Sequence, residues 1–133
     1  MNADKEQLLI MISEDEGLEW IQMVRKAWQA IGNIQITSKA NFLRSDISTR
    51  QNPSCIMIDA SSVHCDLVSL VKDIQKQHGS VPIVIASASP NWEQARDVLH
   101  AGAVDYVKRT TDIQALIDLL IGYAGRASPP KHL

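Results

Sequence analysis

The feature that most constrains this chain is a regular alternation of short apolar runs with longer segments of helical periodicity. The runs are rich in β-branched residues and apolar on both faces, as buried parallel strands are. They lie at residues 8–12, 55–58 and 81–86, with a more polar run at 34–37 and a short one at 103–107. Each run is followed by a segment with apolar residues every three or four positions, which predicts an amphipathic helix. The sequence therefore predicts five β–α units.

This alternation, with short connections, predicts an α/β fold: a doubly wound parallel sheet with helices on both faces. For five strands the usual order is 2-1-3-4-5, as in flavodoxin-like folds. We expect helices over residues 18–32, 41–47, 66–79, 90–102 and 112–123, the second capped by Asn41 and the third by Asp66. Residues 1–125 are expected to form the domain and residues 126–133 a flexible tail or linker remnant.

Length and composition narrow the class of protein. A chain of 133 residues, 45% of them hydrophobic, fits one domain with its own core. Its 13 basic and 15 acidic residues give a net charge of −2, so we expect no direct contact with nucleic acid or a membrane surface. No apolar run is long enough to span a bilayer, and the two cysteines form no disulfide framework. These features predict a cytoplasmic domain.

Polar residues gather where the predicted strands end. In a doubly wound sheet, ligands bind beyond the carboxyl ends of the strands, next to the point where the strand order reverses. Those ends carry Ser13-Glu14-Asp15-Glu16, then Asp59, then Ser87, then Lys108-Arg109. Carboxylates suit Mg²⁺, and a hydroxyl and a cation facing the same point suit transfer of a phosphoryl group to a carboxylate.

The sequence resembles the receiver domains of two-component response regulators, the CheY-like family, over residues 8–123. Three segments in register carry the resemblance. They are Ile-Met-Ile-Asp at 56–59, Pro-Ile-Val-Ile-Ala-Ser-Ala at 82–88 and Ala-Gly-Ala-Val-Asp-Tyr-Val at 101–107.

The resemblance implies a phosphoprotein that acts as a signalling switch in a phosphorelay. Asp59 would accept phosphate from a sensor histidine kinase or a phosphotransfer protein, and Ser87 would be the switch hydroxyl. Glu14, Asp15 and Asp59 would hold Mg²⁺. The protein would not be an enzyme beyond Mg²⁺-dependent self-phosphorylation and autodephosphorylation.

The resemblance also implies a partner surface. Tyr106 would report the phosphorylation state on the face made by the fourth helix, fifth strand and fifth helix, where a second copy could bind. Apart from the resemblance, Trp92 at the start of the fourth helix is a candidate partner contact, with packing at the helix end as the alternative.

The sequence departs from the family pattern at several site positions. Ser13-Glu14 stands where the family has two acids, and Arg109 falls in register with the family's lysine. Lys108 lies one residue early, and since a one-residue slip turns a strand side chain to the other face, only one of the two can point inward. Arg109 is favoured by register, with Lys108 as the alternative. These departures favour a second hypothesis, a phosphorylation-independent pseudo-receiver that serves as an interaction or dimerisation module.

Overall fold

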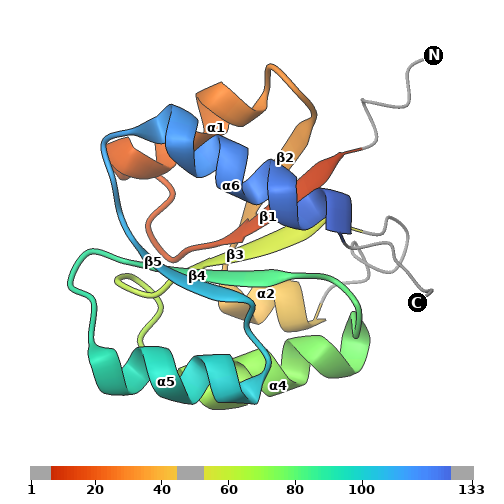
Figure 1. Ribbon diagram of the computed structural model, residues 1–133, viewed down its shortest axis with the longest axis vertical. Coiled ribbons are helices and arrows are strands. Elements are labelled where there is room, and N and C mark those ends of the chain that lie inside the picture. Colours follow the sequence, from red (N-terminus) through yellow and green to blue (C-terminus); the bar gives the residue numbers. More distant parts are fainter. Residues whose placement is uncertain (1–6, 45–52, 127–133) are drawn as a thin grey trace.

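The computed structural model describes residues 7–44 and 53–126. Within these ranges the chain forms five strands and five helices in strict alternation (Figure 1). The strands are β1 (Leu8–Ile12), β2 (Asn33–Thr37), β3 (Cys55–Asp59), β4 (Ile83–Ser87) and β5 (Asp105–Lys108). The helices are α1 (Glu19–Trp28), α2 (Lys39–Arg44), α4 (Leu67–Gln77), α5 (Trp92–Ala101) and α6 (Ile113–Arg126).

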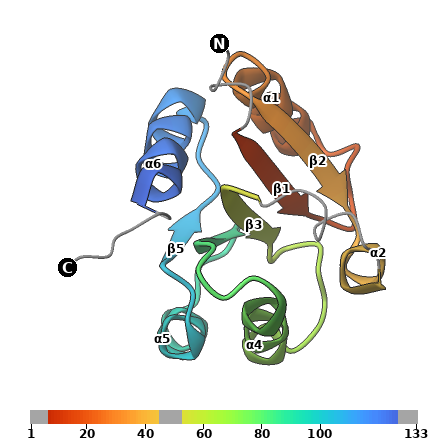
Figure 2. The same ribbon diagram turned by 90° about the vertical axis from the view of Figure 1, so that its right-hand side faces the viewer.

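All five strands are parallel and lie in the order β2-β1-β3-β4-β5, which confirms the predicted fold. Helices α1 and α6 cover one face of the sheet, and α2, α4 and α5 cover the other (Figures 1 and 2). The more polar strand β2 lies at an edge, as its composition predicts. None of the helices in the described part of the chain is long and apolar enough to cross a membrane.

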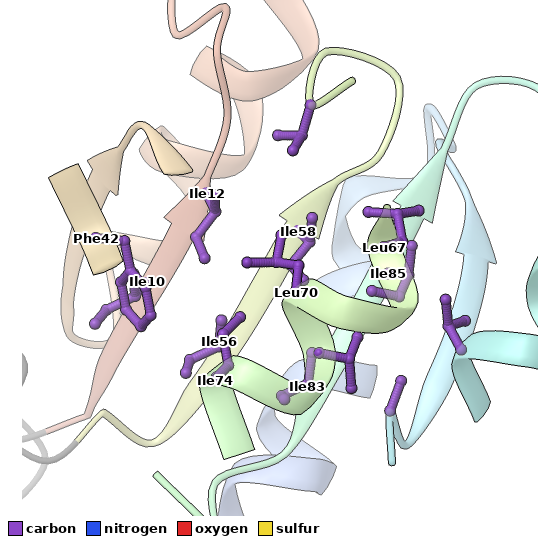
Figure 3. Packing of buried hydrophobic residues seen from close by; sticks show 14 of the residues in the cluster. Ile10, Ile12, Phe42, Ile56, Ile58, Leu67, Leu70, Ile74, Ile83 and Ile85 are labelled. Carbon is purple, nitrogen blue, oxygen red and sulfur yellow. The ribbon is translucent and has the colours of Figure 1, made fainter. Parts of the chain in front are cut away.

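The alternation of side chains along the central strands divides the core into two clusters. Ile10 and Ile12 of β1 face α4, whereas Leu9 and Met11 face α1 and α6. Figure 3 shows the first cluster, in which isoleucines from β1, β3 and β4 meet leucines and an isoleucine of α4 and Phe42 of α2. Because both faces of the three central strands are buried, these strands are apolar throughout, and a polar residue at a strand end stands out.

The helix ends correct several predicted boundaries. Asn41 was expected to cap the second helix, but α2 begins at Lys39 and the Ser38 hydroxyl accepts a bond from the Asn41 amide at 3.1 Å. Asp66 does cap α4, since its carboxylate accepts from the amides of Val68 and Ser69. Helix α1 ends at Trp28, before Gly32, and α6 continues to Arg126, past the predicted end at 123. The proposed tail, apart from residue 126, and residues 45–47 of the predicted second helix lie outside the described residues.

Candidate functional site

The strand register brings the site residues to one edge of the sheet. Ile12 pairs with Ile58 across β1 and β3, so the next residues, Ser13 and Asp59, lie side by side. Ser87 pairs with Lys108 across β4 and β5, and the Arg109 amide then donates to the Ser87 carbonyl at 2.9 Å. The pairing of the main chains thus fixes where the polar residues at the carboxyl ends of β1, β3, β4 and β5 lie.

Asp59 is a fully buried carboxylate whose two oxygens are both bonded. It ends β3 and has no solvent-exposed surface. Its Oδ1 accepts from Nη2 of Arg109 at 2.5 Å. Its Oδ2 accepts from the hydroxyls of Ser62 at 2.8 Å and Ser13 at 3.0 Å. A buried charge is tolerated when it is paired and hydrogen-bonded, and here both conditions are met.

Arg109 is the member of the Lys108-Arg109 pair that contacts Asp59. Val107 packs on the α1 and α6 side of the sheet, and alternation turns residue 109 to that same side. Met57, two residues before Asp59, also packs there. Lys108 has the opposite orientation and is exposed. The guanidinium and the carboxylate therefore meet on one face of the sheet.

The ring of Trp20, on α1, packs against the Arg109 guanidinium. The Cζ atom of Arg109 lies 5.4 Å from the centroid of the Trp20 ring, within the range of a cation–π contact. The indole N–H of the same side chain donates to the Thr110 carbonyl at 2.8 Å. One tryptophan thus contacts two successive residues after β5.

Two short relays of hydrogen bonds run from the main chain to Asp59. The Asp15 amide donates to the Ser13 hydroxyl, at 3.0 Å, and that hydroxyl donates to Asp59. The Glu14 amide donates to the Ser62 hydroxyl, at 2.9 Å, and that hydroxyl also donates to Asp59. The two hydroxyls also lie 3.2 Å from each other, so Ser13, Ser62 and Asp59 form one connected network.

A pocket of about 420 Å³ lies over this network. It is lined by Glu14, Asp15, Leu18, Ser61, Ser62, His64 and Arg109. Asp59 is not among the lining residues, whereas Arg109 and Ser62, which both bond to its carboxylate, are. A ligand in this pocket would contact lining residues of both charges, Arg109 on one hand and Glu14 and Asp15 on the other.

The three side chains predicted to hold Mg²⁺ do not form one site in the described part of the chain. The predicted metal ligands were Glu14, Asp15 and Asp59, but the Glu14 carboxylate accepts from the Lys39 amide at 2.9 Å, at the start of α2. Within the described ranges, no three acidic, histidine or cysteine side chains could hold a metal ion together. The oxygens of Asp59 are already bonded to a cation and two hydroxyls. Mg²⁺ is commonly held by one or two carboxylates together with waters, and the predicted set of Glu14, Asp15 and Asp59 is not brought together at this point.

Ser87 and Tyr106 are placed at the same edge but bonded elsewhere. Ile83 and Ile85 face α4, so alternation turns Ser87 away from Asp59, and its hydroxyl accepts from the Ser89 amide at 3.1 Å. The Tyr106 hydroxyl donates to Gln94 at 2.8 Å and accepts from the Asn91 amide at 3.1 Å. These bonds tie Tyr106 to the first turn of α5.

Trp92, the other predicted partner contact, is the most exposed large apolar residue of the described chain, at 76%. Leu99, seven residues further along α5, is 41% exposed, and Val104, before β5, is 42% exposed. Residues seven apart lie on the same side of a helix. The outer side of α5 thus carries apolar side chains that no part of the described chain covers.

Two residues of the site were not singled out by the sequence. Ser62 lies in the loop after β3, where its only signal is a hydroxyl three residues from Asp59. Trp20 is a buried member of the core cluster between the sheet and helices α1 and α6. Its contact with Arg109 depends on how α1 lies against the loop after β5, which no local pattern encodes.

Comparison with known proteins relates the chain to bacterial regulators. No family model matches the sequence. NtrC of Klebsiella pneumoniae, a DNA-binding transcriptional regulator, is 23% identical over 125 residues, which cover 92% of this chain and 26% of that protein. The NtrC of Escherichia coli K12 is 21% identical over 126 residues, with the same coverage. The chain thus spans about a quarter of the length of these curated relatives.

Solved structures share the fold. The receiver domain of the Francisella response regulator 1452 superimposes with a TM-score of 0.72 at 21% identity, covering 92% of this chain and 98% of that one. An atypical orphan response regulator, described with a phosphorylation-independent regulatory mechanism, superimposes with a TM-score of 0.72 at 17% identity. That match covers 90% of this chain and 97% of the other.

Proposed function

We propose that this chain, which is homologous to the receiver region of NtrC and has the fold of response regulator receiver domains, is a phosphorylation-independent pseudo-receiver. It would act in signalling as a protein-interaction module and not as an enzyme. The observation that carries the proposal is the ion pair between Arg109 and the fully buried Asp59, which leaves neither carboxylate oxygen free.

The chemistry of phosphoryl transfer explains why this ion pair matters. A carboxylate that accepts a phosphoryl group must present an oxygen to the phosphorus in line with the leaving group. At Asp59, Oδ1 faces the guanidinium and Oδ2 receives two hydroxyl protons. A donor would have to displace one of these partners before it could approach. Within the described ranges Glu14, Asp15 and Asp59 do not converge, so these three would not together hold a cation that neutralises the transferring oxygens.

The proposed interaction surface is the exposed side of α5 with β5 and α6. Trp92, Leu99 and Val104 lie in water there, and aromatic residues are enriched at protein interfaces. The hydroxyl of Tyr106 is bonded to the first turn of α5 and would keep that helix in a fixed position relative to β5. A second copy through this face is one candidate partner. A cytoplasmic location accompanies the proposal, because both cysteines of the chain are free thiols.

A phospho-accepting switch is the second candidate, favoured by the arrival of Asp59, Ser87 and Arg109 at one edge of the sheet. In that case a sensor histidine kinase or a phosphotransfer protein would donate the phosphoryl group to Asp59. Ser87 would then have to leave the Ser89 amide and turn toward the phosphoryl oxygens.

Incubation with acetyl phosphate and Mg²⁺, followed by mass spectrometry of the intact protein, separates the two candidates. We expect no phosphoryl adduct on the wild-type chain. The double variant Ser13→Asp with Arg109→Lys restores the residue types of the family pattern and should gain an adduct that a further Asp59→Asn change removes. A wild-type adduct that is lost in Asp59→Asn would replace the pseudo-receiver with the switch.

A further inference from the structure

Arg109 needs a second support besides its ion pair. An arginine side chain loses much rotamer freedom when it is held in one position, and a single bond at its far end leaves the rest of the chain free to turn. Its Nη2 is bonded to Asp59, whereas its Nε is buried without a hydrogen-bond partner among the described residues. The side chain is nevertheless only 17% exposed. Packing on its flat face must therefore hold it in place.

Trp20 provides that packing and is itself fixed. The indole ring is 8% exposed, and Arg109 lies over it with 5.4 Å between Cζ and the ring centroid. The ring cannot slide beneath the guanidinium, because its N–H is bonded to the Thr110 carbonyl. The residue after Arg109 thus anchors the ring on which Arg109 lies.

We propose that Trp20 is the positioning residue of this site: it holds Arg109 over Asp59 and so decides whether the carboxylate can be reached from the pocket. The inference rests on the proposed function, in which the Arg109–Asp59 pair closes the site. Without the indole, the guanidinium can swing into the pocket that it lines. Asp59 would then be exposed to reagents for part of the time.

The reactivity of the Asp59 carboxyl group toward a water-soluble carbodiimide and an amine, followed by peptide mass spectrometry, measures this access directly. Asp97 is the internal reference, because its side chain is 53% exposed and its partner Arg96 is equally accessible. In the wild-type protein we expect Asp59 to react far more slowly than Asp97. In Trp20→Leu we expect the Asp59 rate, relative to Asp97, to rise about tenfold, which corresponds to about 1.4 kcal/mol, the size of a partly desolvated cation–π contact.

Trp28 offers a matched control on the same helix. It is a buried tryptophan of α1 whose indole N–H also donates to a backbone carbonyl, that of Asn33, at 2.9 Å. Trp28→Leu should loosen the core at least as much as Trp20→Leu without changing the Asp59 rate. Should Trp20→Leu fail to fold, the pair Trp20→Phe and Trp28→Phe makes the same comparison, and only the former should raise the rate.

The outcomes distinguish the inference from the function on which it rests. If Asp59 reacts as fast as Asp97 in the wild-type protein, the site is open and the proposed function is wrong. If Arg109→Met opens a closed site but Trp20→Leu does not, the pseudo-receiver stands and the role of Trp20 is refuted. An equal rise in Trp20→Leu and Trp28→Leu would also refute it, since general loosening would explain both.

Discussion

Removing the guanidinium from the Arg109–Asp59 pair should destabilise the protein strongly, and restoring charge balance should recover part of the loss. In Arg109→Met the Asp59 carboxylate stays fully buried and keeps only its two serine donors. Breaking a buried ion pair by removing one partner costs about 3–5 kcal/mol. Because the Arg109 side chain is 17% exposed, we expect the lower end, about 3 kcal/mol.

A double-mutant cycle tests the charge argument itself. Asp59→Asn alone should cost about 2 kcal/mol, because the Arg109 guanidinium keeps an oxygen acceptor but loses its counter-charge. The double variant Asp59→Asn with Arg109→Met holds no unpaired buried charge. It should therefore be more stable than Arg109→Met by about 1–2 kcal/mol, although it carries one more substitution. If Asp59→Asn stabilises the Arg109→Met variant, the instability of that variant comes from the unpaired Asp59 charge.

Urea denaturation followed by far-ultraviolet circular dichroism gives the free energy of unfolding of each variant. Tryptophan fluorescence is unsuitable as the probe, because Arg109 lies on Trp20. Arg96→Met is the control: its partner Asp97 is 3.3 Å away in an exposed pair, so it should cost less than about 1 kcal/mol. Unchanged m values would show that the unfolded states are comparable.

The reasoning is refuted if Arg109→Met costs no more than Arg96→Met. That result would mean that Asp59 is solvated in solution and needs no partner, as an accessible phosphoacceptor would be. Strict additivity across the cycle would also refute it, because two residues that share a buried ion pair cannot be independent.

Two further predictions concern other parts of the molecule. Burial lowers the pKa of His78, which is buried with its Nε2 unbonded among the described residues. The His78 side chain of the unfolded chain therefore binds a proton near pH 6.5, whereas that of the folded chain stays neutral to lower pH. The free energy of unfolding should consequently fall as the pH drops below about 6.5. Urea titrations of His78→Gln should lack this pH dependence, and an equal dependence would contradict the assignment to His78. Trp92→Ser should change the unfolding free energy by less than about 0.5 kcal/mol, because the ring lies in water. Sedimentation velocity on the same variant reports whether the ring holds a second copy, and a loss of stability above about 1 kcal/mol would instead show that the ring packs on its helix.

The parts of the fold that could be predicted are those set by repeating patterns. Strand order and the two-faced core follow from apolar runs alternating with amphipathic segments, and Asp59 is visible because a charge ends a run that is otherwise buried. The cap of α2 was mispredicted because Ser38 and Asn41 are both good capping residues within three positions of each other. Propensity alone cannot choose between them.

The closure of the site could be predicted only in part. Strand alternation favoured Arg109 over Lys108 as the inward residue, since alternation is local and strict. The roles of Ser62 and Trp20 depend on the path of a loop and on the way that α1 packs against the segment after β5. Such contacts between segments far apart in the chain leave no periodic trace in the sequence.

The departures from the family pattern are better understood together than one at a time. Ser13 in place of an acid would weaken a metal site, and Arg109 in place of lysine would crowd it. In combination they leave the Asp59 carboxylate in contact with one guanidinium and two hydroxyls that each donate to it, while Glu14 and Asp15 line the adjoining pocket. Restoring the acid alone would place two carboxylates beside one guanidinium, which raises their mutual repulsion. Each substitution is therefore tolerable chiefly in the presence of the other, which is the physical reason to regard Ser13 and Arg109 as one coupled change around Asp59.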